Sequence, residues 1–423
     1  MEGDRIVADL DFPTSVAVGD GGDLYLAESG LPFGGAAPGG RVWRLGAGGD
    51  RDLVADGLVP PVNGLAWHEG DLYVTEGGAG RIRRLDADGT STTIVSGLPG
   101  PGDYHANMAA FGPDGKLYFS QGSMTNSAVV GLDSLDLGWL ARIPDAHDVP
   151  GMDVVLAGFN IETDDPRTPG AGRATTGAFR PFATPGPAGE RVAAAVPCTA
   201  AIMRCDPDGA HLELVAWGLR NAFGLGFTPA GALLAVDQGA DDRGSRPIGN
   251  APDLLFEVRP GGWYGWPDFI GGDPVTDPAY RPRRGPAPSF VLADHDRLPP
   301  PARPLVRFPA HSAATRFAVL GDGAPWPGQL VVSLFGDEAP MTVPPGPRTG
   351  RGLVRVDPSD WSQHPLVTPG FHRPIDVAWD ADRRALLVVE FGRFEMDAEH
   401  GVRAERRSGA LWQLRPSNGE AAP

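Results

Sequence analysis

The sequence has few cysteines, no long apolar run and little positive charge. Its 423 residues include two cysteines, Cys198 and Cys205, which excludes a disulfide-dense scaffold and offers no metal-ligand spacing. One local disulfide and two reduced thiols both remain open. No run of about 18 apolar residues occurs, so we expect no membrane-spanning helix. The formal net charge of −17 would repel a phosphate backbone, so we do not expect nucleic acid as a partner.

Helical periodicity is also nearly absent, whereas turn-forming residues are plentiful. Gly occurs 60 times and Pro 44 times, while 41% of the residues are apolar, which indicates an ordered chain of short strands and many turns. The N-terminal stretch MEGDRIVADLDFP has no basic region followed by an apolar one. It therefore predicts no secretory signal and leaves the compartment undetermined.

One phrase occurs six times: an apolar triplet, a Gly-rich turn, a second apolar run, and then a polar residue and Gly. The copies are SVAVGDGGDLYLAESG, GLAWHEGDLYVTEGG, MAAFGPDGKLYFSQGS, GLGFTPAGALLAVDQG, FAVLGDGAPWPGQLVVSLFG and DVAWDADRRALLVVEFG. The turn residues predict a β-hairpin in each. Most hairpins precede a further strand, as in GRVWRL, GRIRRL, AAIMRC, DLLFEV, GLVRV and GALWQL.

Three or four strands in each of six units predict an all-β fold, a six-bladed β-propeller over residues 1–423 with long inserted loops. A pair of β-sandwiches would not explain why one phrase returns with the same internal order. The third unit is interrupted by residues 132–197, a loop-rich insertion with many Pro and Gly residues. Loops of this length are mobile or functional.

The innermost strand of each propeller blade lines the central channel, so the residues that enter it share one rim. Alignment of the six copies places at that point Phe12, Pro61, His105, Asn221, Ala313 and Arg373, preceded by Asp11, Pro60, Tyr104, Arg220, Ser312 and His372. We therefore expect His105, Arg220, Asn221 and Arg373 to face one mouth of the channel, and we expect Arg220, Asn221 and Arg373 to bind a cofactor there. The other interpretation is that such residues cap loops or serve the scaffold.

A second set of aligned positions closes each hairpin: Glu28, Glu76, Gln121, Asp237, Leu334 and Glu390. A Gly follows two residues later in five of the six, and it would let backbone carbonyls turn toward a ligand or cation. In the fourth unit the next loop, DQGADDRGSRP, is rich in the oxygen ligands that calcium prefers, without the spacing of a helix-loop-helix calcium site.

With these residues identified, most of the chain resembles the soluble glucose/sorbosone dehydrogenase family. HANMAAFGPDGKLYFSQG is similar to the family's His-x-Gly-Gly strand and WGLRNAFGLGF to its Gly-x-Arg-Asn strand. The loop ending in YGWP and the segment FPAHSAATRF resemble two further family segments. The resemblance implies a six-bladed propeller that oxidises a sugar or a sugar-derived alcohol or aldehyde with pyrroloquinoline quinone and calcium.

The resemblance also implies roles for individual residues. His105 matches the general base that takes the sugar hydroxyl proton while hydride passes to the quinone. Arg220 matches the cation beside the quinone, and Asn221 matches a residue that forms hydrogen bonds to it. Gly239 and Ala240 fall where backbone carbonyls hold the cofactor's calcium.

Several positions depart from the family pattern. Tyr104 stands where an acidic residue usually precedes the base, Leu254 where a glutamate calcium ligand is expected, and DEAP replaces a Ser-Trp-Asn-Arg segment. Two alternatives therefore stay open: a quinone-free propeller enzyme, such as a calcium-assisted lactonase or a lyase on a polar natural product, and a non-catalytic ligand-binding propeller. The substrate and the oligomeric state have no readable pattern.

Overall fold

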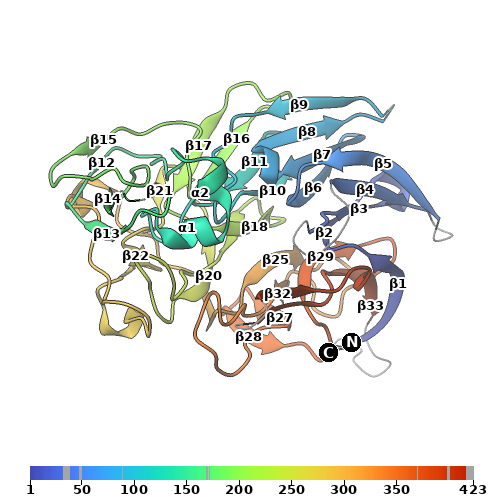
Figure 1. The fold of residues 1–423 in the computed structure, drawn as a ribbon. Coiled ribbons are helices and arrows are strands. Elements are labelled where there is room, and N and C mark those ends of the chain that lie inside the picture. Colours follow the sequence, from blue (N-terminus) through green and yellow to red (C-terminus); the bar gives the residue numbers. More distant parts are fainter. Residues whose placement is uncertain are drawn as a thin grey trace.

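The strands form six sheets of four or five strands, arranged around an axis as the blades of a β-propeller (Figure 1). This computed structural model describes residues 1–31, 39–46, 50–87, 89–167, 170, 172–368, 370–397 and 401–415. The predicted six-bladed all-β fold is confirmed.

Each of the six predicted hairpins supplies the two inner strands of one blade, and the predicted third strands lie beside them. From the axis outward, blade 1 is β2 (Pro13–Val18), β3 (Leu24–Glu28), β4 (Gly40–Leu45) and β5 (Arg51–Leu58). Blade 2 is β6 (Val62–His68), β7 (Asp71–Glu76), β8 (Arg81–Leu85) and β9 (Ser91–Val95). Blade 3 is β10 (Ala106–Phe111), β11 (Leu117–Gln121), β16 (Ala201–Cys205) and β17 (Glu213–Trp217), with the short β21 (Gly262–Trp263) at its edge.

The remaining three blades follow the same order. Blade 4 is β18 (Ala222–Phe227), β19 (Leu233–Asp237), β20 (Pro252–Glu257) and β24 (Val306–Ala310). Blade 5 is β25 (Ala314–Val319), β26 (Leu330–Leu334), β27 (Gly352–Asp357) and β28 (Ser362–Pro365). Blade 6 is β29 (Pro374–Asp380), β30 (Ala385–Glu390), β33 (Gly409–Arg415) and β1 (Glu2–Leu10). The inner strands contact one another in a closed ring in the order β2, β6, β10, β18, β25, β29.

The two ends of the chain close the ring in blade 6. Strand β1 pairs antiparallel with β33, from Glu2 opposite Arg415 to Leu10 opposite Gly409. Figure 1 shows the two strands side by side. The N-terminal strand is therefore the outer strand of the last blade and joins it to blade 1 through the chain.

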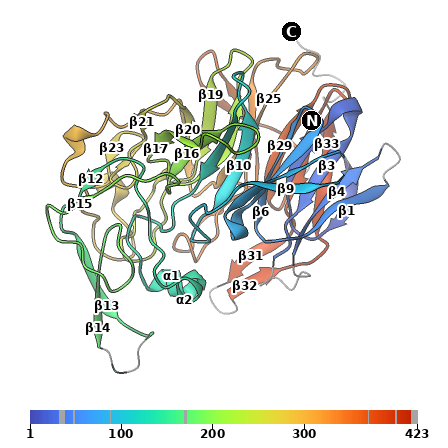
Figure 2. The same cartoon turned by 90° about the horizontal axis from the view of Figure 1, so that it is seen from above.

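The predicted insertion, residues 132–197, lies between β11 and β16 of blade 3, and its residues 168, 169 and 171 lie outside the described part of the chain. It carries two short helices, α1 (Leu132–Asp136) and α2 (Trp139–Arg142). Two ribbons follow, β12 (Val154–Val155) with β15 (Arg191–Val192) and β13 (Asn160–Asp164) with β14 (Arg173–Gly177). In Figure 2 the helices lie on the same side of the blades as the ribbon β31 (Phe394–Asp397) and β32 (Gly401–Ala404). The extent of the domain stays a prediction.

The apolar core lies between neighbouring blades. Strand side chains on both faces of the sheets are buried between neighbouring blades. For example, Leu234 and Val236 of blade 4 pack against Leu330 and Val332 of blade 5. Burial of each such side chain stabilises the folded state by about 1.5–3 kcal/mol of free energy. Cys198 and Cys205 are buried and unbonded, so they are two free thiols. No helix within the described residues is long and apolar enough to cross a membrane.

The axis itself is occupied by Arg316, which is 2% exposed and projects from β25. Its guanidinium contacts residues of all five other inner strands, which are Ser15, the carbonyl of Asn63, the sulfur of Met108, the ring of Phe223 and the carboxylate of Asp376. The distance to the Asp376 carboxylate is 3.7 Å. A buried ion pair thus joins the six blades at the centre.

We predict that replacing Arg316 with methionine (R316M) lowers the free energy of unfolding by about 3–5 kcal/mol, because Asp376 would keep a buried charge without its partner. Urea unfolding followed by tryptophan fluorescence measures the change. The matched control is R41M, which breaks the exposed pair of Arg41 with Asp56 and should cost about 1 kcal/mol or less. Equal stability of R316M and R41M would contradict the prediction.

Candidate functional site

The six aligned rim positions do share one structural place. Phe12, Pro61, His105, Asn221, Ala313 and Arg373 each directly precede an inner strand. Because the inner strands start at the same end of the ring, these residues surround one mouth of the channel. Tyr104, the residue before His105, donates a hydrogen bond to Asp241 and accepts one from Arg220, and its ring lies 4.3 Å from the Arg220 guanidinium. His105 and Arg220 are therefore on the same face, as predicted.

Arg220 is 3% exposed, and the protein itself satisfies its guanidinium. Nε donates to the Asn126 carbonyl at 3.1 Å, and Nη1 donates to the Gly239 carbonyl at 2.6 Å. Nη2 donates to Asn126 Oδ1 at 2.8 Å and to Asp241 Oδ2 at 2.9 Å. All three nitrogens are thus engaged.

Asp241 holds two buried guanidinium groups together. Its Oδ2 accepts from Arg220 at 2.9 Å and from Arg243 Nε at 3.1 Å. Arg243 also pairs with Asp103 at 2.8 Å and with Asp133 at 2.9 Å. Burial alone would raise the pKa of Asp241, but Arg220 and Arg243 hold it below its ordinary value, so Asp241 is ionised at neutral pH.

Asn221 belongs to a chain of side-chain amides that runs around the axis. Its Oδ1 accepts from Asn107 at 2.7 Å, and its Nδ2 donates to Gln238 at 2.8 Å. Asn63 donates to Asn107 at 3.1 Å, and Gln238 donates to the Ala314 carbonyl at 3.2 Å. The chain links blades 2, 3, 4 and 5, and it uses both polar atoms of the Asn221 side chain.

Arg373 is fully buried at the entrance of β29. Its Nε donates to the Phe394 carbonyl at 3.0 Å, and its Nη1 donates to the carbonyls of Gly336 and Asp337 at 2.9 and 2.8 Å. Nη2 lies 3.4 Å from Glu395. These bonds join the loop that follows β26 to strand β31, so the guanidinium is committed to the scaffold.

His105 differs from its neighbours at the mouth because no described residue forms a hydrogen bond with its ring. The side chain is half-buried. It lies close to Gly77, where an added Cβ would come within 2.7 Å of the His105 Cβ. Burial lowers the pKa of His105 to about 4, and the charge of Arg142 acts in the same direction. At neutral pH the imidazole is uncharged and able to accept a proton.

Two further partly buried side chains near this mouth, those of Glu338 and His311, also have no hydrogen-bond or ion-pair partner among the described residues. Glu338 lies in the loop after β26, and no hydrogen bond or ion pair reaches its carboxylate. Burial raises the pKa of Glu338, although Arg373 opposes the shift. His311 precedes β25 and has no hydrogen bond to its ring, and burial lowers its pKa. The partly buried groups without a partner on this face thus include the imidazoles of His105 and His311 and the carboxylate of Glu338.

The second set of aligned positions has a capping role. Glu28, Glu76, Asp237 and Glu390 each accept a hydrogen bond from a backbone N–H just before the inner strand of their own blade. The donors are the amides of Asp11, Val59, Asn221 and His372. The acids therefore fix the course of the chain into the channel.

The residues as placed do not fit the predicted quinone and calcium. Pyrroloquinoline quinone carries three carboxylates, which cationic side chains would have to bind. The two predicted cations, Arg220 and Arg373, donate their N–H groups to oxygen atoms of the protein instead. The Gly239 carbonyl, predicted to bind calcium, already accepts from a guanidinium at 2.6 Å, and a second cation there would be repelled. The Ala240 carbonyl accepts no hydrogen bond from a described residue. Within the described residues, no group of three or more His, Cys, Asp or Glu side chains is placed to hold a metal ion.

The sequence interpretation did not identify the partners of Arg220. Asp241 lies in the loop that was assigned to calcium because of its oxygen atoms, but it binds two arginines instead. Asn126 carried no local signal, since its contact with Arg220 joins residues 94 apart, and neither did the pairing of Arg243 with Asp103, which are 140 residues apart. Tyr104 and Arg220 occupy the same aligned position in neighbouring blades, and this alignment could have indicated their contact.

Comparison with solved structures places the chain among sugar dehydrogenase propellers in fold. An oxidoreductase from Thermus thermophilus described as a glucose dehydrogenase is 19% identical, with a TM-score of 0.57 over 98% of this chain and 99% of its own. The pyrroloquinoline quinone domain of pyranose dehydrogenase from Coprinopsis cinerea is 15% identical, with a TM-score of 0.57 over 97% and 94%. The soluble aldose sugar dehydrogenase of Escherichia coli is 13% identical, with a TM-score of 0.53 over 98% and 99%.

At these identities the similarity establishes the fold and not the activity. The resemblance inferred from the sequence is thereby confirmed as a similarity of fold. No protein-family model matches the chain, and no curated protein matches it either.

We predict that D241N lowers the free energy of unfolding by about 3–5 kcal/mol, because it removes the carboxylate between two buried guanidinium groups. The neighbouring D242N is the control, since among the described residues Asp242 accepts from the backbone amides of Arg283 and Arg284 alone. It should cost about 1–2 kcal/mol. Urea unfolding compares the two variants, and a D241N protein as stable as D242N would contradict the ionic account of this network.

Proposed function

We propose that the protein is an oxidoreductase that acts on a sugar or a sugar-derived alcohol or aldehyde at the mouth of the propeller, with His105 as the base. One observation carries this proposal: His105 is an uncharged imidazole with no partner among the described residues, at the face where the inner strands begin. The two cationic candidates at this mouth, Arg220 and Arg373, form hydrogen bonds to the scaffold instead.

His105 suits the removal of a proton from a substrate hydroxyl. With a pKa of about 4 the ring is almost entirely unprotonated at neutral pH, so its nitrogen is available to accept a proton, and it is a weaker base than an ordinary imidazole. Loss of the hydroxyl proton increases the electron density on the oxygen, which assists departure of hydride from the same carbon to an acceptor. His311 and Glu338 offer further hydrogen-bonding groups for a polyhydroxylated substrate.

The similarity of fold supports oxidation as the reaction. The similar structures are described as a glucose dehydrogenase, an aldose sugar dehydrogenase and a pyrroloquinoline quinone domain. Quinone with calcium is accordingly the acceptor that we propose to test first. Its binding at the predicted residues would require Arg220 to leave the Gly239 carbonyl, so we assign no step to it.

A second candidate function is a quinone-free reaction, such as a lactonase or lyase acting on a polar natural product. The observation that favours it is that Arg220 and Arg373 are fully engaged while the carboxylate of Glu338 is free. In lactone hydrolysis water attacks the carbonyl carbon and the ring C–O bond breaks, and in elimination a proton and a leaving group depart. Neither reaction transfers hydride, and an imidazole and a carboxyl group can supply the base and the acid that both need.

We predict that H105N lowers turnover by about 100-fold or more while the protein stays folded. The assay adds pyrroloquinoline quinone and calcium to the purified protein and measures dye reduction across a panel of sugars, followed by a panel of lactones. The control is H364N, because His364 is an exposed residue of the outer strand β28 and should not affect turnover.

The outcomes separate the candidates. Dye reduction that requires His105 supports the oxidoreductase. Lactone opening without dye reduction supports the second candidate. Ligand binding without turnover, altered only in affinity by H105N, would mean that this propeller is a non-catalytic binding protein.

A further inference from the structure

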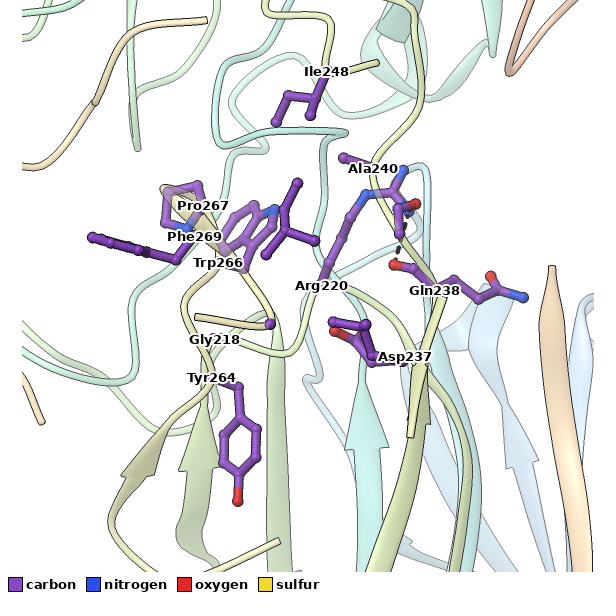
Figure 3. Close-up of a pocket in the computed structure, with 14 residues that line it drawn as sticks. Gly218, Arg220, Asp237, Gln238, Ala240, Ile248, Tyr264, Trp266, Pro267 and Phe269 are labelled. Atoms are coloured by element: carbon purple, nitrogen blue, oxygen red, sulfur yellow. Dashed lines mark hydrogen bonds between the residues drawn. The ribbon is translucent and has the colours of Figure 1, made fainter. Parts of the chain in front are cut away.

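A cavity lies beside Arg220, between the outer edge of blade 3 and the inner strands of blade 4 (Figure 3). It comprises about 350 Å³ including its open side, and its enclosed part has room for about one water molecule. Figure 3 shows Asp237 and Arg220 opposite Trp266 and Phe269. Ala240, Ile248, Leu254, Pro267 and Ile270 also line it, so most of the wall is apolar.

Asp237 is 7% exposed and contributes a carboxyl group to this wall. Its Oδ1 accepts from the Asn221 amide at 2.7 Å, the Arg220 amide also stabilises the charged form, and no described side chain donates to either oxygen. Burial nevertheless raises the pKa of Asp237 to about 7, and the charged groups nearest to it are Arg220 and Asp253. The Arg220 guanidinium does not pair with it, because all three of its nitrogens donate elsewhere.

In blades 1, 2 and 6 the equivalent acid accepts a hydrogen bond from a side chain, which Asp237 does not. Glu28 accepts from the Trp43 indole at 2.7 Å, and Glu390 accepts from the Trp412 indole at 2.7 Å. Glu76 accepts from Arg81 at 2.8 Å. Each of these acids therefore receives a side-chain donor from the third strand of its own blade in addition to the backbone amide that it caps.

The third strand of blade 4 has no such donor. Trp43 and Trp412 stand opposite residues two places before their acids, and the corresponding residue of β20 is Phe256, opposite Ala235. Arg81 stands directly opposite Glu76, and the corresponding residue of β20 is Leu254, opposite Asp237. Asp237 is therefore left with backbone donors alone, and a ligand that donates a hydrogen bond to its carboxyl group would supply the side-chain donor that the other acids have.

We propose that this cavity binds a small neutral alcohol, whose hydroxyl donates to Asp237 in the enclosed part while its short apolar chain lies against Ile248 and Trp266 toward the opening. A cationic ligand is disfavoured by the Arg220 guanidinium, and an anionic ligand by the carboxyl group itself. The site does not depend on the reaction proposed for the mouth.

The probe is 2,2,2-trifluoroethanol, a strong hydrogen-bond donor and weak acceptor, titrated into the full-length protein and observed by ¹⁹F NMR. Saturable binding on the order of 10 mM is expected for so small a ligand. D237N keeps an oxygen for the Asn221 amide but can place an amide donor toward the cavity, so we expect binding to weaken at least about fivefold.

L254Q tests the same site by restoring a donor from the third strand, as Arg81 does in blade 2, and should abolish saturable binding. The matched control is E390Q, which alters the equivalent acid of blade 6 and should leave binding unchanged. Circular dichroism confirms folding of each variant. The proposal is overturned if the unaltered protein shows no saturable binding, which would mean that water alone occupies the cavity, or if D237N binds the probe as tightly.

Discussion

The fold depends on one buried cation at its centre. Arg316 lies where six inner strands converge, and its guanidinium touches a residue from each of the other five blades. Since there is no bulk water on the axis to solvate it, its charge is balanced by Asp376 of blade 6, whose carboxylate also accepts from the Val16 amide of blade 1. The pairing of β1 with β33 closes the ring of blades at its outer edge. This pairing and the contacts of Arg316 on the axis therefore hold the six blades in the same arrangement.

That geometry determines which side chains remain available for chemistry. Six strands that begin on one rim bring residues from distant parts of the chain together, and most of the charges gathered there neutralise one another. Asp241 joins Arg220 to Arg243, Arg373 joins the loop after β26 to strand β31, and Asn221 belongs to an amide chain. His105 is left without such a partner, and its burial keeps it uncharged. The mouth therefore presents a base, and its fixed cations serve the scaffold.

The sequence predicted the repeat and the rim well, because both follow from local patterns. Hairpin turns and apolar alternation are visible in each copy, and alignment of the copies placed His105 and Asn221 one residue before their inner strands. What could not be predicted arises from contacts between distant segments. The role of β1 depends on its meeting with β33, and the capture of Arg220 by Asp241 depends on the path of a loop. Asp241 also shows that a run of oxygen ligands can serve a guanidinium as readily as a metal.

The account rests on His105 being an uncharged base at the mouth. The most direct test is an NMR titration of the histidine ring carbons, with the His105 signal assigned from its loss in H105N. We predict that this signal titrates near pH 4, well below the ordinary imidazole value of about 6.5, because burial disfavours the charged ring. A His105 signal that titrates at or above the ordinary value of about 6.5 would contradict it, since the ring would then be solvated or paired with an acid.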